Sequence, residues 1–176
     1  MSGENDRRFF LGESMSIRKT EHKDLDTVFA IYAHAREQMK KNGNPTQWGD
    51  THPARALIEE DVERGTSYVI EENGEIVGVF AFIPGEDPTY RYIEGEWLNN
   101  APYGTVHRIA SAGKRKGIFE TCLAFCEAQA ENVRVDTHAD NAIMQHLLEK
   151  FGYRRCGVIY VRDGSPRVAY QKEIRT

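Results

Sequence analysis

The sequence lacks the cysteine and histidine patterns of disulfide-stapled and metal-dependent proteins. It has three cysteines, an odd number, and Cys122 and Cys126 lie one helical turn apart. This spacing fits reduced, buried thiols better than a disulfide framework. The six histidines are scattered, and neither a paired Cys-x-x-Cys nor a His-Glu-x-x-His pattern occurs. No metal site is implied.

Two further absences concern partners and location. No apolar run approaches the length of a membrane span, and the apolar part of residues 7–11 is too short for the core of a signal peptide. The formal net charge is -4, with positive charge gathered in only one local cluster, which argues against a protein that coats nucleic acid. We therefore expect a cytoplasmic protein that binds neither nucleic acid nor membranes.

The length is that of a single domain. A chain of 176 residues can bury a sizeable core but is too short for two ordinary domains. Residues 1–14 are polar and unpatterned, so we expect a disordered leader or an extension there, followed by one domain over residues 15–176. No internal repeat is present.

The most informative stretch is residues 103–119, which combines a strand, a glycine-bearing loop and a helix start. Beyond Gly117 the apolar residues recur at helical spacing as far as Ala130. The helix begins directly after three cations, although the helix macrodipole disfavours positive charge at that end. These cations are Lys114, Arg115 and Lys116.

A bound phosphate or pyrophosphate would offset this unfavourable charge. The backbone N–H groups of Gly117, Ile118 and Phe119 are placed to hold it at the helix start. The alternative is a solvated basic turn, as most charge runs are. Glycine spacing argues against a nucleotide P-loop, and the three-glycine dinucleotide fingerprint is absent.

Two motifs resemble the GNAT superfamily of N-acetyltransferases. Its acetyl-coenzyme A loop has the pattern Gln/Arg-x-x-Gly-x-Gly/Ala, and residues 114–119 keep the basic first residue and the central glycine, whereas Phe119 replaces the final small residue. Residues 141–153 resemble the family's Asn-x-x-Ala-x-x-Leu-Tyr-x-x-x-Gly-Phe helix and turn. The resemblance covers roughly residues 15–175. Within the family, the chain looks most similar to a bacterial branch whose members carry the sequences His-Arg-Ile-Ala and Asp-Thr-His-x-Asp-Asn.

The order of elements and the resemblance predict an α/β fold. We expect a single GNAT-like domain with a mixed, mostly antiparallel central sheet flanked by helices on both faces. Asn73-Gly74 between two apolar runs is the strongest hairpin signal. The predicted helices span about 24–41, 53–65, 117–130 and 141–151, and the strands begin at Met15 and then cover about 67–71, 75–83, 103–111, 133–137, 154–161 and 167–172.

The resemblance implies that acetyl-coenzyme A is the co-substrate. Its pantetheine arm would pair with the backbone of the predicted strand like an added strand, at Ile109, Ala110 and Ser111. Its phosphates would lie on the loop, at Lys114, Arg115, Lys116, Gly117, Ile118 and Phe119. Asn141 would reach the cofactor from the neighbouring helix.

Transfer to an amine requires a base, and His107 is the first candidate because histidine exchanges protons near neutral pH. Its position two residues before Ile109 predicts that the two share a strand face. The alternative is a histidine satisfied within the sheet, and Glu94 and Glu96 are weaker candidate bases. The family's tyrosine acid is replaced by Leu148, so water or Tyr160 would have to protonate the leaving thiolate.

The acceptor is expected to be a small-molecule or amino-acid-like amine. Four aromatic residues could border its pocket and contact its cationic group, although each could equally serve core packing. They are Trp48, Tyr90, Trp97 and Tyr103. The sequence thus predicts an N-acetyltransferase that moves an acetyl group directly to a primary amine in a ternary complex. The competing interpretation is a non-catalytic acyl-coenzyme A binding or sensing module, and a homodimer is left open.

Overall fold

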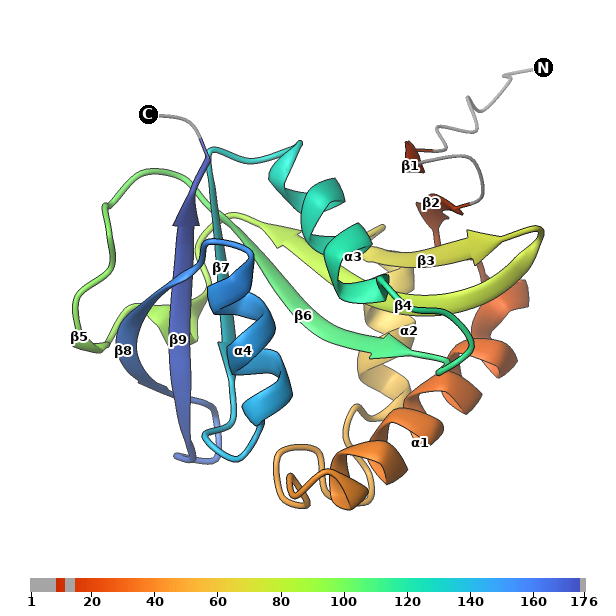
Figure 1. The fold of residues 1–176 in the computed structure, drawn as a ribbon, viewed down its shortest axis with the longest axis horizontal. Coiled ribbons are helices and arrows are strands. Elements are labelled where there is room, and N and C mark those ends of the chain that lie inside the picture. Colours follow the sequence, from red (N-terminus) through yellow and green to blue (C-terminus); the bar gives the residue numbers. More distant parts are fainter. Residues whose placement is uncertain (1–8, 12–14, 175–176) are drawn as a thin grey trace.

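The computed structural model describes residues 9–11 and 15–174. A nine-stranded sheet has the order β1-β2-β3-β4-β6-β7-β9-β8-β5 (Figure 1). The strands are β1 Phe9–Leu11, β2 Met15–Lys19, β3 Ser67–Glu72, β4 Glu75–Pro84, β5 Glu94–Gly95, β6 Gly104–Ser111, β7 Asn132–Thr137, β8 Arg154–Tyr160 and β9 Pro166–Glu173. The α-helices are α1 Leu25–Lys41, α2 Arg55–Glu63, α3 Ile118–Glu127 and α4 Ala142–Lys150, with short 3-10 turns η1 His22–Asp24 and η2 Pro88–Tyr90.

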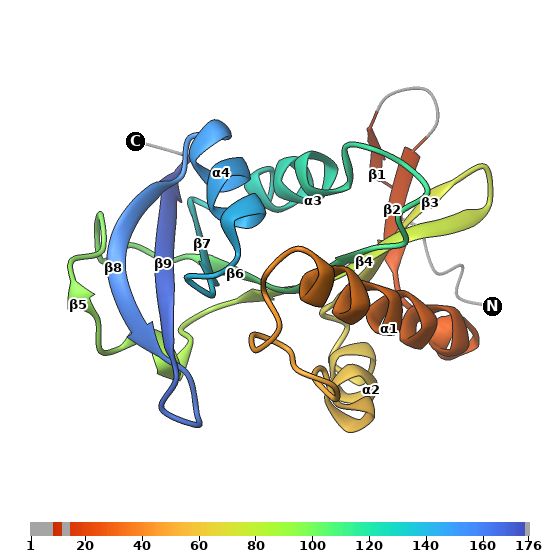
Figure 2. The same ribbon diagram turned by 60° about the horizontal axis from the view of Figure 1, so that its bottom comes forward.

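Helices cover both faces of this sheet. Figure 2 shows α3 and α4 on one face and α1 and α2 on the other. Every neighbouring pair of strands is antiparallel except β6 with β7, which are parallel. The predicted mixed, mostly antiparallel sheet with helices on both faces is confirmed.

The Asn73-Gly74 turn joins β3 to β4 as predicted. Asn73 has φ 51° and Gly74 has φ 80°, and two successive positive φ values are what a type I′ hairpin turn requires. The pairing continues along both strands to Ser67 with Ala81. The register shifts by one residue between Ile70 and Glu71, so the turn fixes the pairing up to that β-bulge and the bulge sets it beyond.

Central strand β4 is apolar on both faces because it lies between two cores. Val79 packs with Val28 of α1 on one face. Phe80 faces the other way, where its ring lies 5.7 Å from that of Phe125 in α3. Burial of apolar side chains on both faces is the main source of stability in such a layered fold.

The start of the chain adds one strand to the sheet edge. β1 pairs antiparallel with β2, so residues 9–11 are ordered within the range 1–14 for which we expected a leader or an extension. Residues 1–8 and 12–14 of that range lie outside the described residues.

The described part of the chain lacks two further features. None of its helices combines the length and apolar composition needed to cross a membrane. In the same residues, no three His, Cys, Asp or Glu side chains are grouped so that they could hold a metal ion. All three cysteines are free thiols, with Cys122 and Cys126 buried and Cys156 half-buried.

Candidate active site

The two parallel strands are paired only where they begin. Their ladder has two residue pairs, ending at Thr105 with Arg134. β6 continues to Ser111 and β7 to Thr137 without further pairs, and Figure 1 shows the strands diverging there. No described strand therefore pairs with one edge of the second half of β6. An extended ligand can add hydrogen bonds along such an edge. This half contains the predicted cofactor-binding residues Ile109, Ala110 and Ser111.

A β-bulge lies in β6 beside this opening. Arg108 and Ile109 lie opposite the single residue Phe80 of β4. Arg108 has φ 51°, which is uncommon for a residue other than glycine. The Tyr32 hydroxyl in α1 donates a 2.7 Å hydrogen bond to the Arg108 carbonyl, and the Asp61 carboxylate in α2 accepts two bonds of 2.8 Å from its guanidinium. Both helices therefore hold the backbone in a strained conformation, as is common at functional sites.

The bulge also changes which side chains share a face of β6. Val106 and Ile109 both pack in the core beneath α3. Because neighbouring strand residues alternate, His107 points to the opposite face from Val106, and therefore from Ile109. The expectation that His107 and Ile109 share a face was wrong, because the extra residue at Arg108 shifts the alternation.

His107 lies within hydrogen-bond distance of an acidic residue from a distant loop. Its Nε2 lies 2.9 Å from Oδ2 of Asp87, and the two side chains are 22% and 17% exposed. The Asp87 backbone N–H in turn donates to the Tyr103 hydroxyl at 2.8 Å. A carboxylate that accepts from Nε2 fixes the orientation of the ring and leaves Nδ1 as the nitrogen that can accept a proton.

The ionisation of Asp87 predicts an acid-dependent loss of stability. Burial raises the pKa of its carboxyl, but hydrogen bonds from His107 and Thr89 outweigh burial and lower the pKa from 3.8 to about 2. The stabilisation, on the order of 2 kcal/mol, is complete above the unfolded pKa near 3.9 and is lost as the pH falls through about 2. Urea unfolding between pH 4 and 2 should show a smaller pH dependence for Asp87→Asn than for the wild type. Equal pH dependence in both proteins would contradict this account.

The three cations before α3 differ in their partners. Lys114 Nζ lies 2.5 Å from Glu75 Oε1, and Arg115 forms an ion pair with Glu72. Lys116 is exposed and forms no ion pair with a described residue. The β3–β4 hairpin thus supplies part of the negative charge that the sequence required, and Lys116 remains available to an anion.

A groove of about 470 Å³ lies between this loop and α4. Ser111 and residues 115–119 line it, and the first-turn N–H groups of α3 begin there. Gly117, the N-cap, has φ 84°, a left-handed conformation that favours glycine. The partly buried side chain of Phe119 packs against the core and also lines the groove. The groove therefore contains most of the predicted cofactor loop.

Helix α4 and its C-cap contribute groove residues that the sequence analysis missed, namely Leu147 and Lys150 of the helix and the C-cap Phe151. Lys150 lies in the last turn of α4, where a lysine is ordinarily explained by the helix macrodipole. The sequence therefore gave no signal that Lys150 does more than stabilise the helix end. In the structure it adds a third cation to the groove, which Arg115 and Lys116 also line.

Asn141 caps α4 and contacts the loop between α1 and α2. Its side-chain oxygen accepts a 3.1 Å hydrogen bond from Met144 N, and its Nδ2 donates to Gln47 Oε1 at 3.3 Å. Capping explains why an asparagine precedes this helix. Asn141 therefore lies at the wide end of the β6–β7 opening.

The four aromatic acceptor candidates are engaged in packing. Tyr90 is 2% exposed and donates to Asp136 at 2.6 Å, and Trp97 and Tyr103 hold the Arg134 guanidinium between their rings at 4.0 and 3.9 Å. Trp48, 9% exposed, packs against α1, with its ring 5.7 Å from Tyr32. Of the two interpretations left open, packing matches these positions.

Glu94 and Tyr160 lie too far from the opening to serve it. They bond to each other at 2.8 Å, in β5 and β8 respectively. β5 is the edge strand, and β9 and β8 separate it from β7. The structure therefore does not bring these two candidates to His107. Leu148, at the family's tyrosine position, is fully buried in the core.

Comparisons with known proteins agree with this geometry. Residues 15–154 match the family model described as an acetyltransferase (GNAT) domain. A GNAT-family acetyltransferase from Streptococcus agalactiae is 35% identical, with a TM-score of 0.86, over 97% of this chain and 100% of that one. A putative acetyltransferase from Staphylococcus aureus is 27% identical, with a TM-score of 0.66, over 90% of this chain and 99% of that one.

A more distant structure shares the fold. The putative acetyltransferase yncA from Salmonella typhimurium, solved with its cofactor acetyl-CoA, is 17% identical, with a TM-score of 0.60, over 92% of this chain and 95% of that one. No functionally curated protein matched the sequence. The family match over most of the chain and the 35% identity to a full-length relative place the chain in the GNAT acetyltransferase family.

Proposed function

We propose that this protein transfers an acetyl group from acetyl-CoA to the primary amine of a small molecule, by direct transfer in a ternary complex. The observation that carries the proposal is the His107–Asp87 pair, oriented beside the bulge where β6 and β7 separate. An amine reacts only when it is neutral, so a base within reach of the acceptor is the first requirement.

The described residues fit acetyl-CoA. The free edge of β6 suits an extended pantetheine arm, and the groove beside α3 offers Lys116, Lys150 and the helix N-terminus to its phosphates. Helix termini and lysines are common phosphate ligands because both present N–H donors and positive charge. Acetyl-CoA, when bound, supplies the acetyl group as a thioester.

The protein's own groups would manage the proton. His107 Nδ1 would accept a proton from the ammonium group of the acceptor, directly or through water, while Asp87 stabilises the imidazolium that results. N–H groups along the free edge of β6 would orient the acetyl carbonyl. The described residues bring no tyrosine hydroxyl from α4 to the opening, because Leu148 occupies that position. Water would then protonate the departing thiolate.

Calorimetric titration of acetyl-CoA, free CoA and ATP tests the cofactor assignment. Micromolar binding of the two CoA species is expected, and Lys116→Ala should weaken it by roughly 5- to 10-fold, the range of one charge-assisted hydrogen bond. Lys114→Ala is the matched control: it removes the same charge two residues away, but Glu75 already compensates Lys114, so about a 2-fold effect is expected.

Other outcomes would change the proposal. Equal losses in the two variants would mean that the loop acts only through its net charge. No heat with either CoA species would overturn the cofactor assignment. CoA binding without acetylation of any amine would favour the sensing module.

A further inference from the structure

Arg167, the second residue of β9, is a buried cation on the face of the sheet that carries His107. Arg167 is 9% exposed. Asp136 of β7 pairs with Ala169 of β9, and since side chains alternate along a strand, Arg167 lies on the same face as these two residues. Ala169 packs with Tyr90, which also bonds to Asp136.

Tyr90 and His107 are neighbours on this face of the sheet. Their rings lie 6.3 Å apart. His52, in the loop between α1 and α2, lies near both His107 and Arg167. Burial lowers the pKa of His52, and the charges of Arg108, Arg167 and His107 lower this pKa further. Arg167 and His107 therefore both lie near enough to His52 for their charges to act on it.

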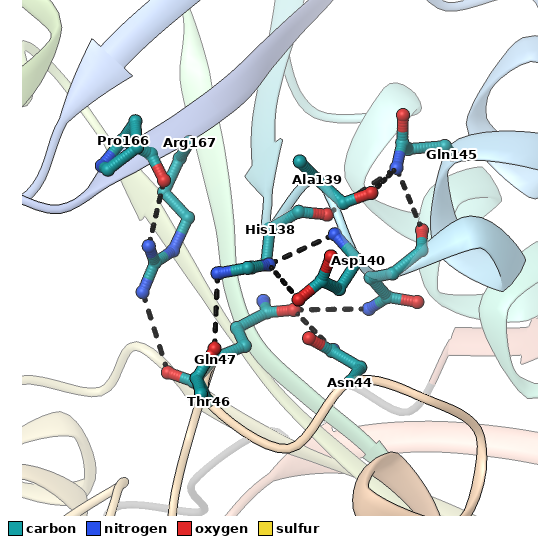
Figure 3. Close-up of polar contacts among 10 residues, drawn as sticks. Asn44, Thr46, Gln47, His138, Ala139, Asp140, Gln145, Pro166 and Arg167 are labelled. Atoms are coloured by element: carbon teal, nitrogen blue, oxygen red, sulfur yellow. Dashed lines mark hydrogen bonds and ion pairs between the residues drawn. The ribbon is translucent and has the colours of Figure 1, made fainter.

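The guanidinium of Arg167 has no acidic partner among the described residues. Nη1 donates to the Pro166 carbonyl at 2.8 Å and Nη2 to the Gln47 carbonyl at 3.5 Å (Figure 3). Asp163, in the exposed β8–β9 turn, feels its charge but forms no ion pair with it. A guanidinium has five N–H donors, so most of its donors are unused. A buried cation without a carboxylate is unfavourable, and a ligand anion would relieve this cost.

The surrounding loops form a rim at the wide end of the opening. Gln47 Oε1 accepts a 3.3 Å hydrogen bond from Asn141. The Thr46 hydroxyl lies 3.3 Å from Nε2 of His138, a contact that is drawn in Figure 3. These contacts join the α1–α2 loop to the segment between β7 and α4. Arg167, in β9, contacts the same α1–α2 loop through the Gln47 carbonyl and completes the rim.

We infer that Arg167 binds the carboxylate of the acceptor, which is therefore a small amino acid or amino-acid-like molecule. The inference rests on the proposed function and narrows its substrate class. The two ends of such a zwitterion match the charges on the face: the carboxylate meets Arg167, and the ammonium group lies toward the acidic side chains of Asp87 and Asp136. A planar guanidinium suits this role because it can donate two parallel hydrogen bonds to one carboxylate.

The test compares each of a panel of amino acids with its own carboxamide, which keeps the amine and removes the negative charge. Thiol release from acetyl-CoA is measured for the wild type, Arg167→Gln and Arg162→Gln. Arg162 is the matched control, an exposed arginine in the turn that precedes β9. Arg167→Gln should lower kcat/KM for the amino acid by roughly 10- to 100-fold and for the carboxamide by less than about 3-fold. Arg162→Gln should change neither.

A different result is expected if Arg167 only holds the α1–α2 loop in place. Thr46→Ala loosens the same loop by removing its contact with His138, and it should lower kcat/KM for both members of a pair alike. If Arg167→Gln behaves in that way, or if the wild type does not prefer the carboxylate, the inference is overturned while acetyl transfer stands.

Absence of turnover with every amine, despite acetyl-CoA binding, would instead overturn the proposed function. Titration of the same amino acids into the CoA-bound protein then decides the inference separately. Binding that Arg167→Gln abolishes would support a carboxylate site, and absence of binding would refute it.

Discussion

Alanine at position 107 is expected to lower kcat by roughly 100- to 10,000-fold, the range that general-base catalysis contributes. The reason is the geometry of the pair: Asp87 binds His107 Nε2 at 2.9 Å and leaves Nδ1 to accept the proton. The affinity for acetyl-CoA should stay within about 2-fold, because the predicted phosphate contacts lie on Lys116 and the start of α3. Steady-state kinetics with the best amine and calorimetry measure the two quantities on the same preparation.

A second histidine provides the matched control. His146 is exposed on α4, and His146→Ala should keep wild-type turnover. Unchanged turnover in His107→Ala would refute the base assignment and return His107 to the role of a histidine satisfied within the sheet.

Much of the fold could be predicted because its signals are local. The Asn73-Gly74 turn fixes a hairpin through backbone conformations that few other residue pairs adopt. The change from strand to helical spacing at Gly117 likewise located α3 to within a few residues. Such patterns depend on neighbours in the chain, so a single sequence suffices to show them.

The arrangement of the site could not be predicted because its contacts join distant segments. Arg108 and Asp61 are 47 residues apart, and neither has a local pattern that names the other. The sequence also gives no sign of the bulge that they support. Strict alternation of side chains therefore predicted the wrong face of β6 for His107. Asp87 had one usable signal: an aspartate before Pro88 and Thr89 is typical of a capping residue, and its side chain does cap η2.

Composition alone leaves the role of the aromatic candidates open. A cluster of tyrosine and tryptophan beside a strand predicts either recognition or packing. For Trp97 and Tyr103 the structure shows packing, because the Arg134 guanidinium lies over both rings. Its pairing with these rings depends on the register of β7, which emerges only when the sheet is assembled.

Removing the carboxylate of Asp61 is expected to destabilise the fold by about 3–5 kcal/mol, because it leaves the Arg108 guanidinium buried without its partner. The two side chains are 6% and 11% exposed and share two 2.8 Å hydrogen bonds. At about 2–4 °C per kcal/mol for a domain of this size, Asp61→Ala should lower Tm by about 10 °C. Turnover at low temperature should fall as well, since the ion pair holds the bulge beside His107.

Comparison with a neighbouring acid separates burial from charge. Glu60 is 49% exposed and bonds Arg64 at 2.6 Å one turn along α2, so Glu60→Ala should cost less than about 1 kcal/mol. The double variant Asp61→Leu/Arg108→Met replaces both charges by apolar groups, and it should recover most of the stability that Asp61→Ala loses. If urea unfolding shows the double variant to be as unstable as Asp61→Ala, the unpaired charge is not the cause. The two hydrogen bonds themselves would then be what keeps the strained backbone of β6 in place.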